Sequence, residues 1–357
     1  MPHQTLRIID ANCNRISEGL RFLEDIARFL LNDAGLTRQL KTMRHDLIKD
    51  LSKLDVALLS ERDSTSDVGA NINRGQHQDL PSLVTANAKR VQEALRVVEE
   101  LAKLPELRAV VHSKDFEQSR FKLYALEKEL LSRILRHQKI ARLTGLYVII
   151  DSQALKQKDE VDAAGKAICG GANVIQFRDK NHSKSGILTI ARKIKDLCQK
   201  ANVLFIINDH LDIALAVDAD GLHIGQDDLP LAVARRELPI DKIIGLSTRT
   251  LAQALQAEFS GADYVAIGSI YPSPTKPQAT VVGLERLREI REAISIPIVA
   301  IGGINKENIS TVMAAGADSV AVISAVTLQE DVETSTRELV REIEKETKSH
   351  QKPGNYH

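Results

Sequence analysis

The chain has no net charge, few cysteines and no long apolar run, and each of these absences excludes a class of protein. Lys plus Arg and Asp plus Glu both number 48 in 357 residues, so any basic site must be local and nothing global points to nucleic acid. No segment approaches the ~20 apolar residues needed to cross a bilayer, and no basic N-terminus precedes an apolar run. We therefore expect a cytoplasmic protein without membrane or nucleic-acid partners.

Three further signatures are also missing. Cys13, Cys169 and Cys198 are odd in number and lack Cys-x-x-Cys spacing, which argues against a disulfide framework or a zinc site. No Gly-x-Gly-x-x-Gly follows the first expected strand, and no Gly-x-x-x-x-Gly-Lys-[Ser/Thr] loop is present to bind ATP. With 43% apolar and 27% charged residues, the chain has enough apolar material for two globular domains.

The first part of the chain, residues 1–138, predicts an all-α domain with an internal repeat. Apolar residues recur there at spacings of three and four, as in amphipathic helices. Residues 11–24 and 86–99 share the frame Asn-x-x-Arg-x-x-Glu-x-Leu-Arg-x-x-Glu, 75 positions apart. Each copy precedes another helical stretch, 36–54 or 115–135. The pattern indicates two pseudo-equivalent helical hairpins that form a four-helix bundle.

The polar residues of the repeat divide between two faces of the helix. The helical period places four of them within the apolar face, namely Asn12, Arg15, Asn87 and Arg90. It turns four others away, where an exposed ladder of ion pairs is expected: Glu18, Arg21, Glu93 and Arg96. The first set is either a structural polar cluster or a pseudo-twofold anion site. Between the hairpins, residues 61–75 predict a turn-rich loop that could cover a ligand.

The second part of the chain, residues 139–347, alternates strands and helices eight times. Buried strands are expected at residues 144–151, 173–177, 203–207, 221–224, 243–246, 263–267, 296–301 and 319–323. This number of strand and helix units predicts an α/β fold, a (β/α)8 TIM barrel preceded by the all-α helical-bundle domain. A doubly wound open sheet is the alternative. Residues 348–357 are expected to form a disordered tail.

Polar residues follow nearly every expected strand, on the side of a barrel where active sites form. Carboxylates come after the third and fourth strands, and cations come after the second and in the loop 268–276. Gly302 and Gly303 follow the seventh strand, where barrels commonly bind phosphate. Carboxylates and cations at one mouth predict Mg²⁺ with a diphosphate, since Mg²⁺ is commonly bound by one or two carboxylates and phosphate oxygens.

From about residue 145 to 326 the chain resembles thiamine phosphate synthase. The resemblance is carried by Gln-x-Arg-x-Lys at 176–180, Ile-Asn-Asp at 207–209, His-x-Gly-Gln-x-Asp at 223–228, Pro-x-x-Thr-Lys at 272–276 and Ile-Gly-Gly-Ile at 301–304. It implies an enzyme that joins hydroxymethylpyrimidine diphosphate to thiazole phosphate and releases diphosphate, with Mg²⁺ as cofactor and no covalent intermediate.

The resemblance also implies roles for individual residues. Those expected to bind the two substrates are Gln176, Phe177, Arg178, Asp179, Lys180, Asn208, Ser247, Ser273, Pro274, Thr275, Lys276, Gly303, Ile323 and Ser324. Catalysis is assigned to Arg178, Lys180, Ser247 and Lys276, and Mg²⁺ binding to Asp209 and Asp228. One departure is visible, because Ser273 stands where the family usually has threonine; the hydroxyl is retained.

The helical domain resembles the ThiD2 family, fused ahead of this synthase in some bacteria and proposed to phosphorylate hydroxymethylpyrimidine phosphate with ATP. Three alternatives stay open. The bundle could be a non-catalytic oligomerisation module, the barrel could be a thiazole tautomerase, and the protein could bind thiamine precursors without turnover. Retention of both Mg²⁺ aspartates argues against the tautomerase. The oligomeric state is also open, and a homo-oligomer is compatible with the sequence.

Overall fold

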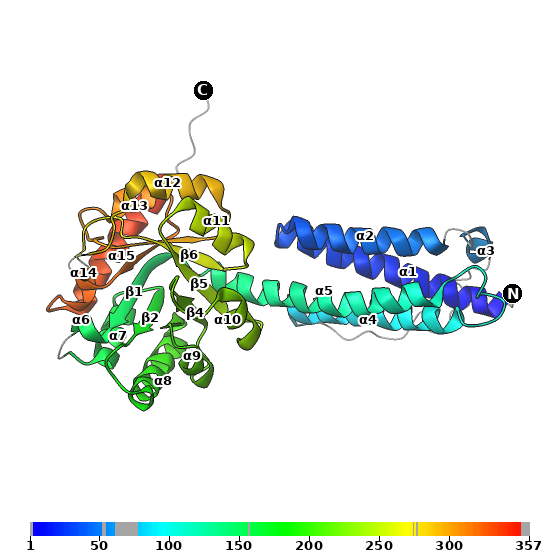
Figure 1. Ribbon diagram of the computed structural model, residues 1–357, viewed down its shortest axis with the longest axis horizontal. Coiled ribbons are helices and arrows are strands. Elements are labelled where there is room, and N and C mark those ends of the chain that lie inside the picture. The colour runs from blue at the N-terminus through cyan, green and yellow to red at the C-terminus, as the bar shows by residue number, and fades with distance from the viewer. Residues whose placement is uncertain are drawn as a thin grey trace, which may run out of the picture. The chain divides into compact units, whose positions relative to one another are not determined.

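The computed structural model describes residues 3–51, 55–60, 78–155, 158–273, 275 and 278–350. It divides into two compact units, Met1–Leu135 and Arg136–His357, and each is described by itself. The expected loop at 61–75 lies outside the described residues. Figure 1 labels the elements of both units.

The first unit is helical. Its elements are α1 (His3–Asp25), the π-helix η1 (Ile26–Leu30), α2 (Ala34–Leu51), α3 (Asp55–Ser60), α4 (Leu80–Leu101) and α5 (Ser113–Ile140), and the unit boundary falls within α5. Helix α1 packs against both α2 and α4. Leucines and valines at three- and four-residue spacing, such as Leu20 and Leu95, form one buried core. The prediction of an all-α first region is confirmed.

The internal repeat also has a structural counterpart. The final glutamates of the two frames, Glu24 and Glu99, are buried and pair with arginines of the following long helices. Nη2 of Arg44 lies 2.9 Å from Oε2 of Glu24, and Nη2 of Arg120 lies 3.1 Å from Oε2 of Glu99. A buried carboxylate needs such a partner, so each ion pair holds one long helix against the next.

The second unit is a closed barrel of eight parallel strands, each hydrogen-bonded to the next and the last to the first. The strands are β1 (Gly145–Asp151), β2 (Val174–Arg178), β3 (Leu204–Asn208), β4 (Gly221–Ile224), β5 (Ile243–Thr248), β6 (Tyr264–Ile267), β7 (Ile298–Ile301) and β8 (Ser319–Val322). They confirm the predicted barrel, and each lies within two residues of its expected position.

Helices cover the outside of the barrel (Figure 1). They are α6 (Ser152–Leu155), α7 (Glu160–Cys169), α8 (Lys184–Ala201), α9 (Leu211–Ala216), α10 (Leu231–Glu237), α11 (Leu251–Phe259), α12 (Gly283–Ala293), α13 (Ile309–Ala314), α14 (Ser324–Thr327) and α15 (Val332–His350). One apolar core lies between strands and helices, and a smaller one fills the barrel. Strand residues alternate between them, so every second side chain faces the barrel axis.

Two features concern the ends of the described chain. Helix α15 continues to His350, so the first three residues of the expected tail are helical, and residues 351–357 lie outside the described residues. Among the described helices, none combines the length and apolar character needed to cross a membrane.

Candidate functional site

A cavity of about 360 Å³ opens at the carboxyl ends of the barrel strands. All eight strand ends contribute to its lining. Eleven of the residues expected at the site line it: Gln176, Arg178, Lys180, Asn208, Asp228, Ser247, Ser273, Thr275, Gly303, Ile323 and Ser324. Pro274 and Lys276 lie outside the described residues.

A chain of hydrogen bonds crosses the floor of this cavity. Nε2 of Gln176 donates to the hydroxyl of Tyr147 over 2.7 Å, and that hydroxyl lies 3.2 Å from the hydroxyl of Tyr264. The same Tyr264 oxygen lies 3.1 Å from Nδ1 of His223, whose Nε2 lies 2.9 Å from Oγ of Ser247. The network therefore links Gln176 on β2 to Ser247 on β5, two residues expected to contact the same ligand.

Tyrosine and histidine give this floor a fixed geometry. Burial raises the pKa of the Tyr147 hydroxyl and of the Tyr264 hydroxyl, so both stay protonated at neutral pH and can donate hydrogen bonds. The His223 ring stacks on the Tyr264 ring with centroids 5.6 Å apart. Gly245 makes room for this stack, because a Cβ there would lie 2.0 Å from Cζ of Tyr264.

The rim of the cavity carries paired charges. Nη1 of Arg178 donates to Oδ2 of Asp151 over 2.5 Å, and the arginine side chain is only 14% exposed. Nζ of Lys180 lies 3.5 Å from Oδ2 of Asp209, with half of the lysine side chain exposed. Asp209 lies beside the cavity lining, at the end of β3, in the left-handed backbone region. Its N–H donates to the carbonyl of His223 over 2.9 Å, which holds this turn.

Two carboxylates approach each other at this rim. Burial, and then the neighbouring carboxylate of Asp228, raise the pKa of Asp209 above its ordinary value. Burial opposes ionisation of Asp228 as well, but the Gly225 N–H, which donates to its Oδ2 over 2.7 Å, and Asp209 outweigh that effect and lower the pKa of Asp228. Like charges held this close favour either a shared proton or a bound cation.

Small residues form the opposite side of the cavity. Gly302 and Gly303 have φ angles of 101° and 65°, a region that favours glycine. A Cβ on Gly302 would lie 2.1 Å from Oγ of Ser269, and one on Gly303 would lie 2.4 Å from the carbonyl oxygen of Pro272. The glycines therefore let the loop after β7 pack closely against the loop after β6, which carries Ser273 and Thr275.

Two expected contacts are not brought into the cavity. Phe177 faces the helices rather than the barrel axis, because it alternates with Gln176 and Arg178 along β2, and it is buried in the outer core. The Asp179 side chain is buried too. Its Oδ2 accepts from Oγ of Ser152 over 2.9 Å, and its Oδ1 accepts from the N–H groups of Asn181 and His182.

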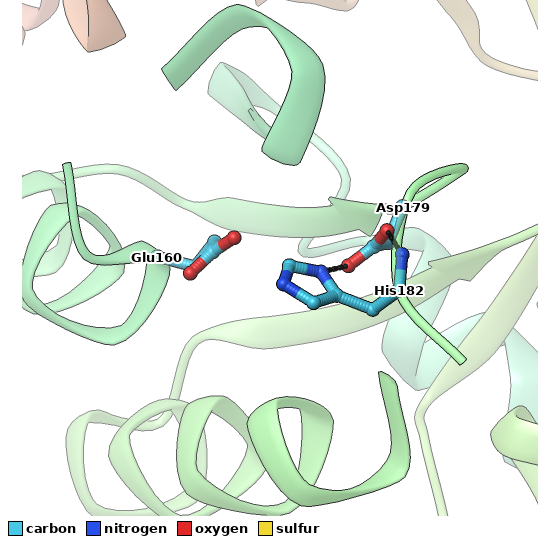
Figure 2. A group of neighbouring side chains, drawn as sticks. All are labelled: Glu160, Asp179 and His182. Carbon is cyan, nitrogen blue, oxygen red and sulfur yellow. Dashed lines mark hydrogen bonds and ion pairs between the residues drawn. The ribbon is translucent and has the colours of Figure 1, made fainter. Parts of the chain in front are cut away.

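Asp179 belongs to a cluster with Glu160 and His182, shown in Figure 2, whose potential ligand atoms lie within 4.8 Å of one another. Nδ1 of His182 lies 2.7 Å from Oδ2 of Asp179, and this hydrogen bond raises the pKa of the His182 ring. Burial opposes ionisation of Asp179, but its hydrogen bonds outweigh that effect and lower its pKa. Both oxygens of Asp179 are thus occupied, and the cluster fixes the loop that carries Lys180.

Four residues that support the expected site had no role predicted from the sequence. Tyr147 and Asp151 on β1, His223 on β4 and Tyr264 on β6 all line the cavity. Each faces the barrel axis from within a strand or at its last residue, whereas the residues predicted from the sequence lie mainly at and after the strand ends. The signal that could have found them is the two-residue alternation counted back from each strand end.

A second cavity, of about 490 Å³, lies in the helical unit between α1 and α4. Its lining contains corresponding residues of both repeat copies: Asn12, Arg15, Glu18 and Gly19 from α1, and Asn87, Arg90, Glu93, Ala94 and Val97 from α4. A Cβ on Gly19 would lie 2.3 Å from Cγ2 of Val91, so glycine permits the close approach of these two helices.

Two expectations about these helices are corrected by the structure. Arg15 is exposed and Arg90 half-buried, so neither lies within the apolar core as the helical phase suggested. Glu18 and Glu93 line the cavity instead of pairing with Arg21 and Arg96. Those two arginines pair with other carboxylates, Arg21 with Asp25 over 3.4 Å and Arg96 with Glu99 over 2.6 Å.

Fold and site together define a (β/α)8 barrel enzyme whose mouth suits phosphorylated ligands. The family model described as "Thiamine monophosphate synthase" matches residues 146–326, and the model "ThiD2 family" matches residues 7–129. The chain is 39% identical to a thiamine-phosphate synthase of Thermosynechococcus vestitus over 94% of both chains. It is 38% identical to one of Nostoc punctiforme over 94% of this chain and 93% of that protein.

Among solved structures, the chain is similar to a thiamine phosphate pyrophosphorylase from Pyrococcus furiosus, with a TM-score of 0.54 and 43% identity over 58% of this chain and 98% of that one. The chain therefore belongs to the thiamine monophosphate synthase family, and it is an enzyme of the transferase type. The resemblances described from the sequence, to this family and to ThiD2, are confirmed.

Proposed function

We propose that the barrel joins hydroxymethylpyrimidine diphosphate to thiazole phosphate, forming thiamine phosphate and releasing diphosphate. The observation that carries the proposal is the division of the cavity into three parts. Polar side chains with fixed hydrogen bonds form its floor, cations line the rim at the end of β2, and glycines and hydroxyls form the opposite side. A ring, a diphosphate and a phosphate are the groups that such parts recognise.

The reaction forms a carbon–nitrogen bond and breaks a carbon–oxygen bond. As diphosphate leaves the pyrimidine methylene carbon, negative charge grows on the departing oxygen, next to Arg178 and Lys180. The thiazole nitrogen captures the carbocation that remains. No general base is needed because this nitrogen carries no proton to lose. Lys276, implied by the resemblance, would add a third cation.

The floor network supports the position of the pyrimidine. Gln176 and Ser247 are each held by a buried partner, Tyr147 and His223, and need no reorganisation when the ring binds. The thiazole phosphate would lie opposite, with Ser273, Thr275 and Ser324 as hydroxyl donors near Gly303. The backbone N–H groups of such glycine turns commonly bind phosphate.

The family implies Mg²⁺, and the residues present fit it. Asp209 and Asp228 interact with each other at the rim, and two neighbouring carboxylates supply the oxygen ligands that Mg²⁺ commonly takes from a protein. When bound, Mg²⁺ would neutralise charge on the diphosphate leaving group. The chain's own part is to hold the two carboxylates close together, through the Asp209 turn and the Gly225 N–H.

The test uses purified full-length protein with both substrates and Mg²⁺, and follows thiamine phosphate and diphosphate by chromatography. We expect both products in equal amounts, and a loss of at least about 100-fold in kcat for Asp209→Asn. Asp212→Asn is the matched control, because Asp212 pairs with Lys184 on the surface. Isomerised thiazole phosphate without diphosphate release would indicate a tautomerase instead, and binding of both substrates without product would indicate a binding protein.

A second activity, phosphorylation of hydroxymethylpyrimidine phosphate by ATP, is a candidate for the helical unit. It is supported by the ThiD2 match at residues 7–129 and by the charged cavity between α1 and α4. The same assay, started from the pyrimidine monophosphate with ATP, tests it. Product from the diphosphate alone would favour a non-catalytic role such as oligomerisation. Cytoplasmic location stays a prediction of the sequence.

A further inference from the structure

The cavity between α1 and α4 gathers four charged side chains that make no ion pairs within the described part of the chain. Arg15 and Arg90 contribute two positive charges, and Glu18 and Glu93 contribute two negative ones. Each of these arginines instead donates a hydrogen bond to an asparagine, which orients its guanidinium group. The other arginines of the frame, Arg21 and Arg96, are both in ion pairs at 3.4 and 2.6 Å.

The two asparagines are themselves fixed. Nδ2 of Asn12 donates to the carbonyl of Ile8 over 2.7 Å, which leaves its Oδ1 to accept from Nη1 of Arg15 over 3.2 Å. The second copy repeats this arrangement: Nδ2 of Asn87 donates to the carbonyl of Leu83 over 2.8 Å, and its Oδ1 accepts from Nη1 of Arg90 over 3.4 Å.

A neutral amide partner orients a guanidinium without neutralising it. Each arginine has five N–H donors, and the asparagine takes one, so most donors stay available to a ligand. Guanidinium groups bind phosphate oxygens through two parallel hydrogen bonds. Two such groups in one cavity therefore suit a phosphoryl group better than any neutral ligand.

Glu18 and Glu93 indicate which kind of phosphorylated ligand fits the cavity. Carboxylates in the same cavity would weaken the binding of a bare anion without abolishing it, and they accept hydrogen bonds from amino or hydroxyl groups of a larger ligand. The volume of about 490 Å³ lies within the usual range for small-molecule sites.

We propose that this cavity binds a small phosphate ester, with its phosphoryl group on Arg15 and Arg90 and its amino or hydroxyl donors on Glu18 and Glu93. This proposal assigns a substrate site to the kinase activity proposed above for the helical unit. Only the identity of the physiological ligand rests on that activity. Its test measures binding without turnover, so failure of the site and failure of either enzymatic activity can be told apart.

The test is a nuclear magnetic resonance titration of the arginine Nε–Hε signals of the full-length protein with inorganic phosphate. Signals are assigned from the variants Arg15→Lys, Arg90→Lys, Arg21→Lys and Arg96→Lys. We expect the Arg15 and Arg90 signals to shift along one saturating curve while those of Arg21 and Arg96 stay in place. Reporting by residue separates this site from phosphate bound at the barrel.

The proposal that Arg15 and Arg90 bind the same phosphoryl group gives a quantitative check. In Arg15→Lys, the phosphate affinity reported by Arg90 should fall by about ten-fold, since one charged hydrogen-bond fork is lost. Absence of any shift, a shift of one arginine alone, or the same shift with sodium chloride at equal ionic strength would overturn the proposal.

The glutamates are tested with a matched pair of probes, phosphoethanolamine and ethyl phosphate. The wild type should bind the amine more tightly, by several-fold, and Glu18→Gln with Glu93→Gln should remove this preference while retaining inorganic phosphate binding. Equal affinity for the two probes in the wild type would overturn the assignment of the glutamates.

Discussion

Removing the hydroxyl of Tyr264 tests whether the hydrogen bonds on the cavity floor position the site. Tyr264 is completely buried, and its hydroxyl lies 3.2 Å from that of Tyr147 and 3.1 Å from Nδ1 of His223. Tyr264→Phe removes both hydrogen bonds. It retains the ring that stacks on His223, so no large cavity forms.

The magnitude follows from the two lost bonds. Each buried hydrogen bond contributes about 1 kcal/mol net, so the variant should be less stable by roughly 2 kcal/mol. For a unit of this size that lowers the melting temperature by roughly 4–8 °C. Because His223 also holds Ser247 over 2.9 Å, looser placement of the pyrimidine should lower kcat/KM by about ten-fold, mostly through KM.

Differential scanning calorimetry and steady-state kinetics measure the two effects on one preparation. Tyr124→Phe is the control, because Tyr124 is 43% exposed in the helical unit and its hydroxyl accepts from Arg120 over 3.3 Å. It should change stability by less than about 0.5 kcal/mol and leave the kinetics unchanged. A Tyr264→Phe variant with wild-type melting and kinetics would refute the inference that the network positions the site.

Three further perturbations test other parts of the barrel unit. The hydrogen bond to Asp179 raises the pKa of His182 from its ordinary 6.5. The protonated ring therefore stabilises the fold fully below pH 6.5, and this stabilisation is lost as pH rises through the higher folded-state pKa. His182→Gln should remove this decline from melting curves recorded between about pH 6 and 9. Gly245→Ala should lower the free energy of unfolding, measured by urea titration, by about 1–3 kcal/mol, because its Cβ would lie 2.0 Å from the Tyr264 ring. Gly165→Ala is the control: its nearest contact would be 3.7 Å away, so it should leave stability unchanged or raise it. Burial and Asp228 raise the pKa of Asp209, so ionising Asp209 destabilises the fold as pH rises above about 3.8. Without Mg²⁺, Asp209→Asn should therefore have a higher melting temperature than the wild type at neutral pH. An equal or lower melting temperature would contradict the raised pKa of Asp209.

The barrel could be predicted from sequence because its strands are continuous apolar runs separated by amphipathic helices. Runs such as Leu204–Asn208 are buried throughout, and eight of them alternating with helices favour a closed barrel over a doubly wound open sheet. The rim of the site could be predicted as well, since residues after parallel strands meet at one end of a barrel. The floor of the site could not be predicted, because the hydrogen bond between Tyr147 and Tyr264 forms only once β1 and β6 face each other across the barrel.

The helical cavity shows a different limit of sequence reasoning. The phase of α1 placed Asn12 and Arg15 on the apolar face, and Asn12 is indeed 4% exposed. Arg15 lies at the edge of that face, where the neighbouring helix decides between burial and exposure. Gly19 permits the close approach of α1 and α4 and also lines the cavity between them, and a helical period alone cannot predict such a crossing.

The two sites present cations to phosphate in different ways, and this difference has a measurable consequence. In the barrel, Arg178 is bonded to Asp151 and Lys180 lies 3.5 Å from Asp209, so a diphosphate must share each cation with a carboxylate. A divalent cation on Asp209 would reduce this competition at Lys180. Arg15 and Arg90 have only amide partners in the described structure, so phosphate has no carboxylate to displace from them. Removal of Mg²⁺ should therefore weaken diphosphate binding at the barrel while the phosphate titration of the Arg15 and Arg90 signals stays unchanged. Equal dependence of both sites on Mg²⁺ would show that Glu18 and Glu93 act as metal ligands rather than as acceptors of ligand hydrogen bonds.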